Sequence, residues 1–144
     1  MHTSFFTALA ALATVATVVV GAIPYDCTRK TTVKAGDTCA KISVAQKVST
    51  YQLMTVNKGI IDTACHLHVG EEICLGIRYQ DCTDVHVVKN GENCVGICKA
   101  AGISLSTLYT NNQNLFRDCS FVLPGDVLCV SKHLYYSPDG IPPV

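Results

Sequence analysis

Nine cysteines are the most reactive side chains in this sequence of 144 residues, and eight of them form a regular pattern. The eight recur as two sets of four at matching places: Cys27, Cys39, Cys65 and Cys74, then Cys82, Cys94, Cys119 and Cys129. Four cysteines in a set can form two disulfides in three different pairings. Cys98 is left over, because Ser43 stands at its place in the first set.

A zinc site is the alternative use of these thiols. Cys94 and Cys98 could bind a zinc ion together with histidine ligands, namely His66, His68 and His86. However, no two cysteines have the C-x2-C spacing that structural zinc sites prefer. We therefore expect disulfides, no metal site and no cofactor.

Carboxylates are the other residues to consider, because two of them across a cleft can act as general acid and base in a hydrolase. Glu71 and Glu72 are neighbours in sequence, so in a strand they point to opposite faces. Asp37 and Asp62 form the other candidate pair, but both are typical loop residues. The sequence therefore predicts a protein that is not an enzyme.

The cysteine sets are carried by two copies of one repeat. The stretch Val33–Cys39, which reads VKAGDTC, returns 55 positions later as Val88–Cys94, which reads VKNGENC. In the first copy we predict a short strand at 32–34 and a helix over about 39–47, with Thr38 as its N-cap. The matching residues predict the same elements in the second copy.

A second helix should begin at Ser49, because Ser49 and Gln52 have the spacing of a capping box. It should end at Asn57-Lys58-Gly59, and a second strand should lie within 67–75. Strand, helix, helix, strand in two tandem copies predicts an α+β protein of two small modules. Modules of about 50 residues bury little surface, which is a further reason to expect disulfides.

Both ends of the chain are predicted to lie outside the modules. Residues 1–22 contain no Lys, Arg, Asp or Glu and end in an A-x-A-like site, as in a signal peptide cleaved after Ala22. An uncleaved membrane anchor is the alternative, since the apolar run is close to the length of a membrane span. The remaining predicted parts are module 1 at 23–76, a linker at 77–81, module 2 at 82–131 and a flexible C-terminal tail at 132–144.

The charge of the chain limits its partners. Eleven basic and eleven acidic residues give a net charge of zero, and all of them follow Ala22. Nucleic acid and anionic lipid both need a basic surface, so we expect no nucleic acid and no membrane as partner after signal cleavage. A neutral ligand fits this composition. The predicted signal peptide indicates a secreted, extracellular protein, which is either free or associated with a cell wall.

One disulfide pairing follows from the proposed antiparallel strands. In each module the cysteine before the first strand would pair with the cysteine in the loop. The cysteine at the start of the first helix would pair with the cysteine on the closing strand. The predicted bridges are Cys27–Cys65, Cys39–Cys74, Cys82–Cys119 and Cys94–Cys129. Cys98, beside Ile97 on the inner side of a helix, is interpreted as a buried thiol or as the site of an intermolecular disulfide.

The whole pattern resembles the LysM family, and most closely its fungal secreted members that consist only of such modules. The family motif V-x-x-G-D-T is similar to Val33–Thr38, and Ile42-Ser43 stands where the first helix usually has I-A. A helix ending in Asn57 and a closing segment Gly70–Ile73 complete the match in module 1. Module 2 repeats these features at Val88–Asn93, Ile97-Cys98, Leu108–Asn112 and Gly125–Leu128.

The resemblance implies binding of N-acetylglucosamine-containing glycans, above all chitin or chitin oligomers. In the family the groove lies between the loop after the first strand and the loop after the second helix. In module 1 the matching residues are Gly36, Asp37, Thr38, Thr55, Val56, Asn57, Lys58 and Ile60. In module 2 they are Gly91, Glu92, Asn93, Thr110, Asn111, Asn112, Gln113 and Leu115. Glu92-Asn93 replaces Asp-Thr, so the second site departs from the motif and has no hydroxyl like that of Thr38.

The resemblance also implies two biological uses, which are sequestering chitin fragments from host immune sensing and shielding a fungal wall from chitinases. Several alternatives stay open. Peptidoglycan is a second glycan of the right kind, and a disulfide scaffold also suits a pure interaction protein or an inhibitor. A homodimer, formed through a shared glycan or through Cys98, is a further alternative.

Overall fold

The computed structural model describes residues 21–115, 117–120 and 122–136. Nearly all of the predicted signal peptide at 1–22 and most of the predicted tail at 132–144 lie outside these residues. In the part of the chain that is described, no helix is long and apolar enough to cross a membrane.

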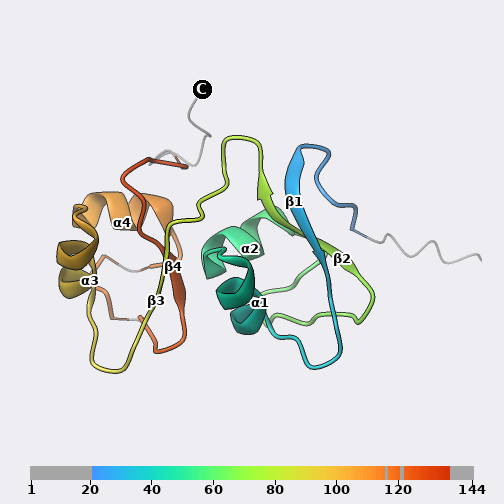
Figure 1. Ribbon diagram of the computed structural model, residues 1–144, viewed down its shortest axis with the longest axis horizontal. Helices are drawn as coiled ribbons and strands as arrows, with labels where there is room; N and C mark the ends of the chain where they lie inside the picture. The colour runs from blue at the N-terminus through green and yellow to red at the C-terminus, as the bar shows by residue number, and fades with distance from the viewer. Residues whose placement is uncertain (1–20, 116, 121, 137–144) are drawn as a thin grey trace, which may run out of the picture.

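Both modules follow the predicted order of strand, helix, helix and strand, and the predicted α+β class is confirmed. Module 1 contains β1 (Cys27–Thr32), α1 (Cys39–Gln46), α2 (Thr50–Val56) and β2 (Glu72–Ile77). Module 2 contains β3 (Val85–Val87), α3 (Cys94–Ala101), α4 (Leu105–Asn111) and β4 (Val127–Cys129). The strands pair antiparallel, β1 with β2 and β3 with β4. Figure 1 shows the two modules side by side, each with its helices packed beside its strand pair.

Each of these helices begins at a polar side chain that accepts a hydrogen bond from a backbone amide inside the helix. The four caps are Thr38, Ser49, Asn93 and Ser104. Asn93 was expected to leave module 2 without an equivalent of the Thr38 hydroxyl. Instead, its amide oxygen accepts a hydrogen bond from the amide of Gly96 at 2.9 Å, so a different chemical group keeps the cap.

The predicted capping box at Ser49 is only half right. The Ser49 hydroxyl accepts a bond from the Gln52 amide at 3.1 Å, as expected. The Gln52 side chain does not return to Ser49, because it is fully buried and bonds elsewhere. Its Nε2 donates to the carbonyl oxygen of Leu75 at 2.7 Å and to Asp81, and its Oε1 accepts from the amide of Cys82 at 2.9 Å. Gln52 therefore fixes the chain between the modules onto α2.

The first strand begins earlier than predicted. β1 covers Cys27–Thr32, and Val33, expected at its centre, lies just after it. Val33 still exchanges backbone bonds with the segment opposite, donating to Glu71 and accepting from Gly70. The strand carries six polar or sulfur-containing residues, so no apolar alternation in the sequence indicates it.

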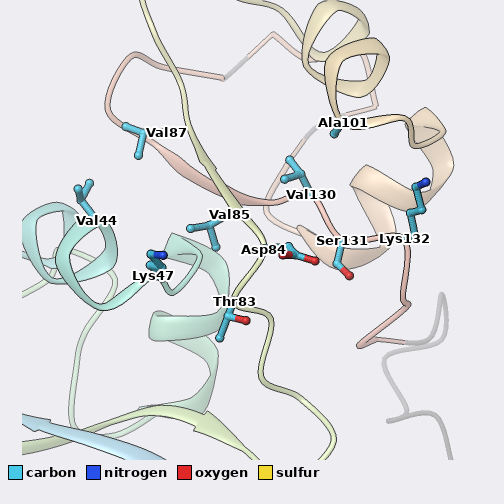
Figure 2. A pocket seen from close by; sticks show the side chains of 10 residues that line it. All are labelled: Val44, Lys47, Thr83, Asp84, Val85, Val87, Ala101, Val130, Ser131 and Lys132. Carbon is cyan, nitrogen blue, oxygen red and sulfur yellow. The ribbon is translucent and has the colours of Figure 1, made fainter.

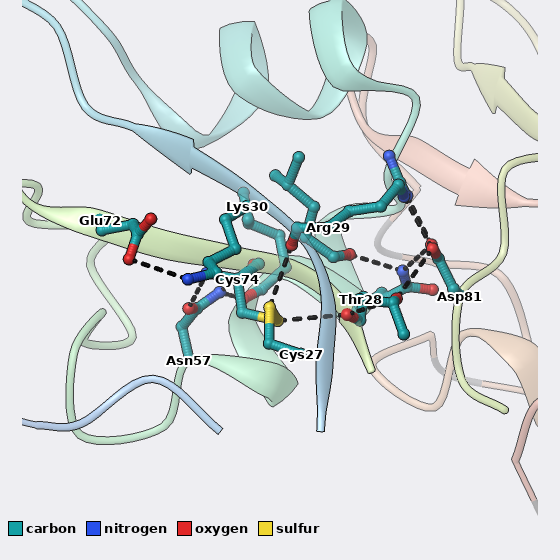
Figure 3. Close-up of a disulfide and its surroundings, with 12 residues drawn as sticks. Cys27, Thr28, Arg29, Lys30, Asn57, Glu72, Cys74 and Asp81 are labelled. Carbon is teal, nitrogen blue, oxygen red and sulfur yellow. Dashed lines mark hydrogen bonds and ion pairs between the residues drawn. A yellow bond between two sulfur atoms is a disulfide. The ribbon is translucent and has the colours of Figure 1, made fainter. Parts of the chain in front are cut away.

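This shift changes the disulfides, and the predicted pairing is wrong in both modules. Because Cys27 lies within β1, it is beside β2 and bridges to Cys74 on that strand, as Figure 3 shows. That leaves Cys39, at the start of α1, to bridge to the loop cysteine that packs against it. The observed bridges are Cys27–Cys74, Cys39–Cys65, Cys82–Cys129 and Cys94–Cys119.

The predicted linker at 77–81 is held firmly against module 1. Ile77 and Gln80 bridge across a tight turn, with Tyr79 at a φ of 66°. Asp81 then accepts hydrogen bonds from Arg29 of β1, including one from Nε at 2.7 Å (Figure 3). Together with Gln52, this ion pair fixes the point at which the chain enters module 2.

The described part of the predicted tail is packed rather than loose. Tyr136 is 5% exposed, and its ring meets that of Tyr51 in α2 edge to face, with centroids 5.1 Å apart. The buried side chain of Asn111 in α4 binds the same segment. It donates to the carbonyl oxygen of His133 at 2.8 Å and accepts from the amide of Tyr135 at 2.9 Å. The segment 131–136 therefore joins both modules.

Cys98 lies in the core of module 2, where it is 5% exposed and without a disulfide partner. It packs in one cluster with Ile97 and Leu108. Burial raises the pKa of its thiol, because the apolar surroundings disfavour the thiolate. These surroundings favour the interpretation as a buried thiol over that as an intermolecular bridge.

Candidate functional site

In module 1 the two loops that should form the site are joined by a disulfide. The first loop, 33–38, leads from β1 into α1, and the second loop, 57–65, follows α2. Cys39 directly follows the first loop, and its partner Cys65 ends the second. The corrected pairing therefore ties the two loops to each other, whereas the predicted one would have tied the first loop to the closing strand.

The first loop is held in one shape by its own side chains. Asp37 accepts a hydrogen bond from the amide of Lys34 at 2.8 Å, and Thr38 caps α1. The ammonium of Lys41 donates to the carbonyl oxygen of Gly36 at 2.8 Å. Gly36 has a φ of 82° and is exposed, and a Cβ added there would have no atom within 4 Å. The loop thus offers open backbone at Gly36 and an exposed residue at Thr38.

Asn57 was expected in the groove, but it is a scaffold residue. It is fully buried, its Nδ2 donates to the carbonyl oxygens of Leu53 and Cys74, and its Oδ1 accepts from the amide of Cys74 at 2.7 Å. Asn112 makes the same three bonds in module 2, to Leu108 and Cys129. In both modules the asparagine ends the second helix and fastens it to the closing strand, which leaves no polar atom for a ligand.

The remaining expected residues of module 1 divide by exposure. Val56 is 6% exposed and belongs to the core. Thr55 and Ile60 are half-buried, and Lys58 is exposed. Of the residues expected on the second side of the module 1 groove, only Thr55, Lys58 and Ile60 are therefore accessible to a ligand.

The residues just before the first module touch this second loop. A Cβ on Gly21 would lie 2.4 Å from the carbonyl oxygen of Gly59 and 2.9 Å from the Cγ1 of Ile60. Gly21 belongs to the predicted signal peptide, so cleavage after Ala22 would remove this contact.

In module 2 the first loop keeps the shape but changes its attachments. Gly91 has a φ of 81° and the same open space as Gly36. Glu92 accepts from the amide of Lys89 at 2.8 Å, so it takes the turn role of Asp37. Its carboxylate also pairs with Nε2 of His86 at 2.7 Å, and these bonds, that of His86 first, lower the pKa of Glu92. The loop of module 2 is thus tethered to β3 by a pair that module 1 lacks.

Three expected residues of module 2 line one pocket of about 580 Å³ on α4 and the chain after it. They are Thr110, Gln113 and Leu115. Asn111 points elsewhere, since its side chain is buried and bonded to the C-terminal segment. Asn111 and the adjacent Asn112 are therefore not among the residues that line the pocket.

Three further described residues that line this pocket were not predicted from the sequence. They are Ser106, Tyr109 and Arg117. A signal for Tyr109 did exist, because the repeat has Met54 at the same place. A difference between two copies in an otherwise matched stretch indicates a change of role.

A larger groove of about 690 Å³ lies between the modules and contains none of the expected residues. Figure 2 shows it between the end of α1 and the strands of module 2, with apolar side chains near its middle. The lining residues include Val44, Lys47, Val85, Val130 and Lys132. None of the described residues in its lining is aromatic.

The candidate carboxylates Asp37 and Asp62 are both engaged by their own loops. Asp37 and Asp62 each accept backbone bonds within their own loops, Asp62 from the amides of Ala64 and His66. Bonds from His66 lower the pKa of Asp62, which is the opposite of what a general acid needs. In the described residues no group of three or more His, Cys, Asp or Glu side chains is placed to hold a metal.

Comparisons with known proteins give the fold a family. The model of the LysM domain matches residues 31–76 and 86–131. The "Secreted LysM effector LysM2" of Penicillium expansum is 26% identical over 72% of this chain and 33% of its own length. The "Non-secreted LysM effector LCP1" of Gibberella moniliformis is 31% identical over 75% of this chain and 14% of its own. Other matched relatives are also named secreted LysM effectors.

Among solved structures, the spore cortex-lytic enzyme SleL of Bacillus megaterium QM B1551 is 20% identical over 80% of this chain and 22% of that chain, at a TM-score of 0.35. A similarity that low supports no conclusion about function. The chain spans one third or less of the length of the two fungal relatives. Because the family model covers more than half of the chain, once in each module, this protein belongs to the LysM family and carries two LysM domains.

Proposed function

We propose that this chain is a non-catalytic protein that binds chitin or N-acetylglucosamine oligomers through its LysM domains. The observation that carries the proposal is the pair of loops in each module, which a disulfide joins directly. A site that is held in one shape before the ligand arrives loses less entropy on binding.

The exposed groups of these loops suit a neutral amido sugar. N-acetylglucosamine has an amide, several hydroxyls and an apolar methyl group, so it needs short polar groups and a small apolar contact. Module 1 offers the backbone at Gly36, the residues Thr38, Thr55 and Lys58, and the half-buried Ile60. The net charge of zero agrees with a neutral ligand.

Module 2 offers a related set that differs in detail. The pocket on α4 is lined by the half-buried Thr110, the exposed Gln113 and the buried Leu115, and the backbone at Gly91 has open space around it. We leave Asn57, Asn111 and Asn112 out of the proposed sites because their side chains are bonded within the scaffold.

A single module should bind weakly, because each hydrogen bond contributes only about 1 kcal/mol net. Two modules on one polymer gain affinity through effective concentration. The proposal therefore predicts tighter binding to longer oligomers, and calorimetry with a series of chitin oligomers measures it. Equal affinity for short and long oligomers would argue against joint use of the modules.

The decisive test is retention of the mature protein on insoluble chitin. The variant Gly36→Asn with Gly91→Asn places a side chain in each open loop, and asparagine tolerates a positive φ better than other residues. We expect this double variant to lose retention. Gly70→Asn with Gly125→Asn is the matched control, because these glycines have φ values of 89° and 94°, open surroundings and positions outside the proposed loops. If the unmodified protein does not bind chitin, the proposal is wrong.

The same assay separates the alternatives. Retention on peptidoglycan in place of chitin would change the ligand but keep the site. Failure on both glycans would favour an interaction protein or an inhibitor on a disulfide scaffold. Release of shorter products from labelled chitin oligomers would contradict the proposed lack of catalysis.

We further propose that the protein is secreted and acts outside the cell, either by sequestering chitin fragments from host sensing or by shielding a fungal wall. The names of several relatives and the predicted signal peptide support secretion, although one relative is named non-secreted. The module boundaries at 23–76 and 82–131 stay a prediction. A homodimer also stays a hypothesis.

A further inference from the structure

We propose that module 2 carries an additional sugar-stacking subsite on α4, with Tyr109 as its platform and with Gln113 positioned by Tyr51 of module 1. The proposal rests on the proposed function, because its ligand is a pyranose unit of the same N-acetylglucosamine oligomer. It adds Tyr109, Ser106, Arg117 and Tyr51 to a site that the resemblance limits to two loops of one module.

The first support is the composition of the pocket. Its described lining includes the ring of Tyr109, the polar side chains of Ser106, Thr110, Gln113 and Arg117, and the apolar side chain of Leu115. A pyranose ring has an apolar face of C–H groups and an edge of hydroxyls, so it matches an aromatic surface bordered by donors and acceptors. Among the described residues that line the larger groove between the modules none is aromatic, so that groove does not show this match.

The second support is the fixed position of the Tyr109 side chain. It packs against the core of module 2 and is half-buried. Its hydroxyl donates to the carbonyl oxygen of Arg117 at 2.8 Å, so the ring is anchored at both ends. A ring held in this way can contact a sugar with little further loss of conformational entropy.

The third support is a contact from module 1. The hydroxyl of Tyr51 in α2 donates to Oε1 of Gln113 at 3.0 Å, which sets the orientation of the amide at the edge of the pocket. Tyr51 is itself held by Tyr136, whose ring lies edge to face against it. Tyr51 is thus a positioning residue, and the site of module 2 is complete only when module 1 is docked.

Module 1 lacks this arrangement. At the places of Ser106, Tyr109 and Gln113 it has Tyr51, Met54 and Lys58. The Met54 sulfur contacts the Cys39–Cys65 bridge, with 3.9 Å between its Sδ and the Sγ of Cys39. The two modules therefore differ in function at α2 and α4, although their folds match.

The test uses the full mature chain with Gly36→Asn, which blocks module 1, and calorimetry with chitin hexamer. Tyr109→Met is the informative variant, because module 1 already accepts Met at this place. We expect it to lower the association constant about tenfold, since a well-placed aromatic contact contributes on the order of 1.4 kcal/mol, which is a factor of ten. A thermal melt of the same variant checks that module 2 is folded.

A second measurement detects the stacking itself. Sugar ring protons that lie over a tyrosine shift upfield in proton NMR, and this shift should disappear in Tyr109→Met. If Tyr109→Met binds with unchanged affinity and the sugar protons keep their shifts, the subsite does not exist. If the Gly36→Asn chain with Tyr109 intact fails to bind any oligomer, the proposed function of module 2 has failed instead.

Tyr51→Phe tests the positioning role. It removes only the hydroxyl that reaches Gln113 and should weaken binding by about fivefold, the equivalent of one hydrogen bond of about 1 kcal/mol. Tyr136→Phe is the matched control, because the Tyr136 hydroxyl is buried with no hydrogen-bond partner among the described residues. We expect Tyr136→Phe to bind as the parent does. Equal losses in both variants, or no loss in Tyr51→Phe, would overturn the role of Tyr51.

Discussion

Asn57 and Cys74 exchange two hydrogen bonds through one side-chain amide. The Nδ2 of Asn57 donates to the carbonyl oxygen of Cys74 at 2.6 Å, and its Oδ1 accepts from the amide of the same residue at 2.7 Å. The amide thus imitates a strand backbone and pairs with β2 from the end of α2. Asn112 and Cys129 repeat the relationship in module 2.

This relationship makes stability, not affinity, the property that Asn57 controls. Asn57→Ala would leave a buried amide and a carbonyl of Cys74 without partners, and each such loss costs about 1 to 3 kcal/mol. We expect the free energy of unfolding to fall by about 3 kcal/mol, measured by chemical denaturation. Binding per folded molecule should stay the same. Lys58→Ala, next to it on the surface, is the control and should leave stability unchanged within about 0.5 kcal/mol.

If folded Asn57→Ala had a lower affinity for chitin and an unchanged stability, Asn57 would be a ligand-binding residue of the groove and not a scaffold residue. This outcome is distinct from unfolding, because the folded fraction is measured by near-ultraviolet circular dichroism in the same samples.

The disulfides are expected to have separate roles. Removing either bridge of module 1 as a pair of Cys→Ala changes should cost on the order of 3 to 4 kcal/mol by the chain-entropy estimate for loops of 26 and 47 residues. Only the loss of Cys39–Cys65 should also weaken chitin binding by the folded protein, because this bridge joins the two proposed binding loops. Calorimetry on both double variants at a temperature at which both are folded makes the comparison. Equal affinities would mean that the bridge does not organise the site.

The duplication made the order of elements predictable from sequence. Two copies match along most of their length, and the caps at Thr38 and Ser49 follow from their local patterns. A cap is local because it depends on residues only three positions apart. The bridge between Cys27 and Cys74 is not local, and its prediction failed because β1 is a polar strand without an apolar pattern.

The candidate site was predictable only in part, for a similar reason. The turn at Gly36 is visible in sequence, since Gly-Asp interrupts the pattern between strand and helix, and the φ of 82° at Gly36 is one that glycine adopts readily. The burial of Asn57 depends on where β2 lies, and the hydrogen bonds of the Gln52 side chain depend on the position of the linker. Neither can be predicted from the local sequence pattern. The contact between Tyr51 and Gln113 joins residues 62 apart in sequence and needs the docking of both modules.

The pair of Glu92 and His86 predicts a pH dependence that belongs to module 2. Bonds from His86 and the amide of Lys89 hold the pKa of Glu92 below its ordinary value of 4.5. A carboxylate whose pKa is lower in the folded state stabilises the fold above its unfolded pKa, and this contribution disappears as the pH falls through the folded pKa. The melting temperature of the parent should therefore exceed that of Glu92→Gln near neutral pH, and the two should converge as the pH falls through the lowered pKa of Glu92.

His86→Ala is the control for the cause of this effect. It removes the largest cause of the lowered pKa of Glu92 and keeps the bond from the amide of Lys89. At neutral pH the melting temperatures of His86→Ala and Glu92→Gln should therefore differ less than those of the parent and Glu92→Gln. A melting-temperature gap between parent and Glu92→Gln that is the same at neutral and acid pH would show that the charge of Glu92 is not involved.

Two glycines allow opposite predictions for the same substitution. A Cβ on Gly76 would lie 2.3 Å from the Cγ of Asp81, so alanine must displace the carboxylate that binds Arg29 and Gln52. We expect Gly76→Ala to destabilise the protein by about 1 to 3 kcal/mol, as overpacking does. Gly96 lies inside α3, and an added Cβ would meet only Asn93 at 3.6 Å, so Gly96→Ala should stabilise by about 0.5 to 1 kcal/mol. Denaturant midpoints of the two variants measure both effects, and a neutral Gly76→Ala would mean that the link between the modules does not depend on Asp81.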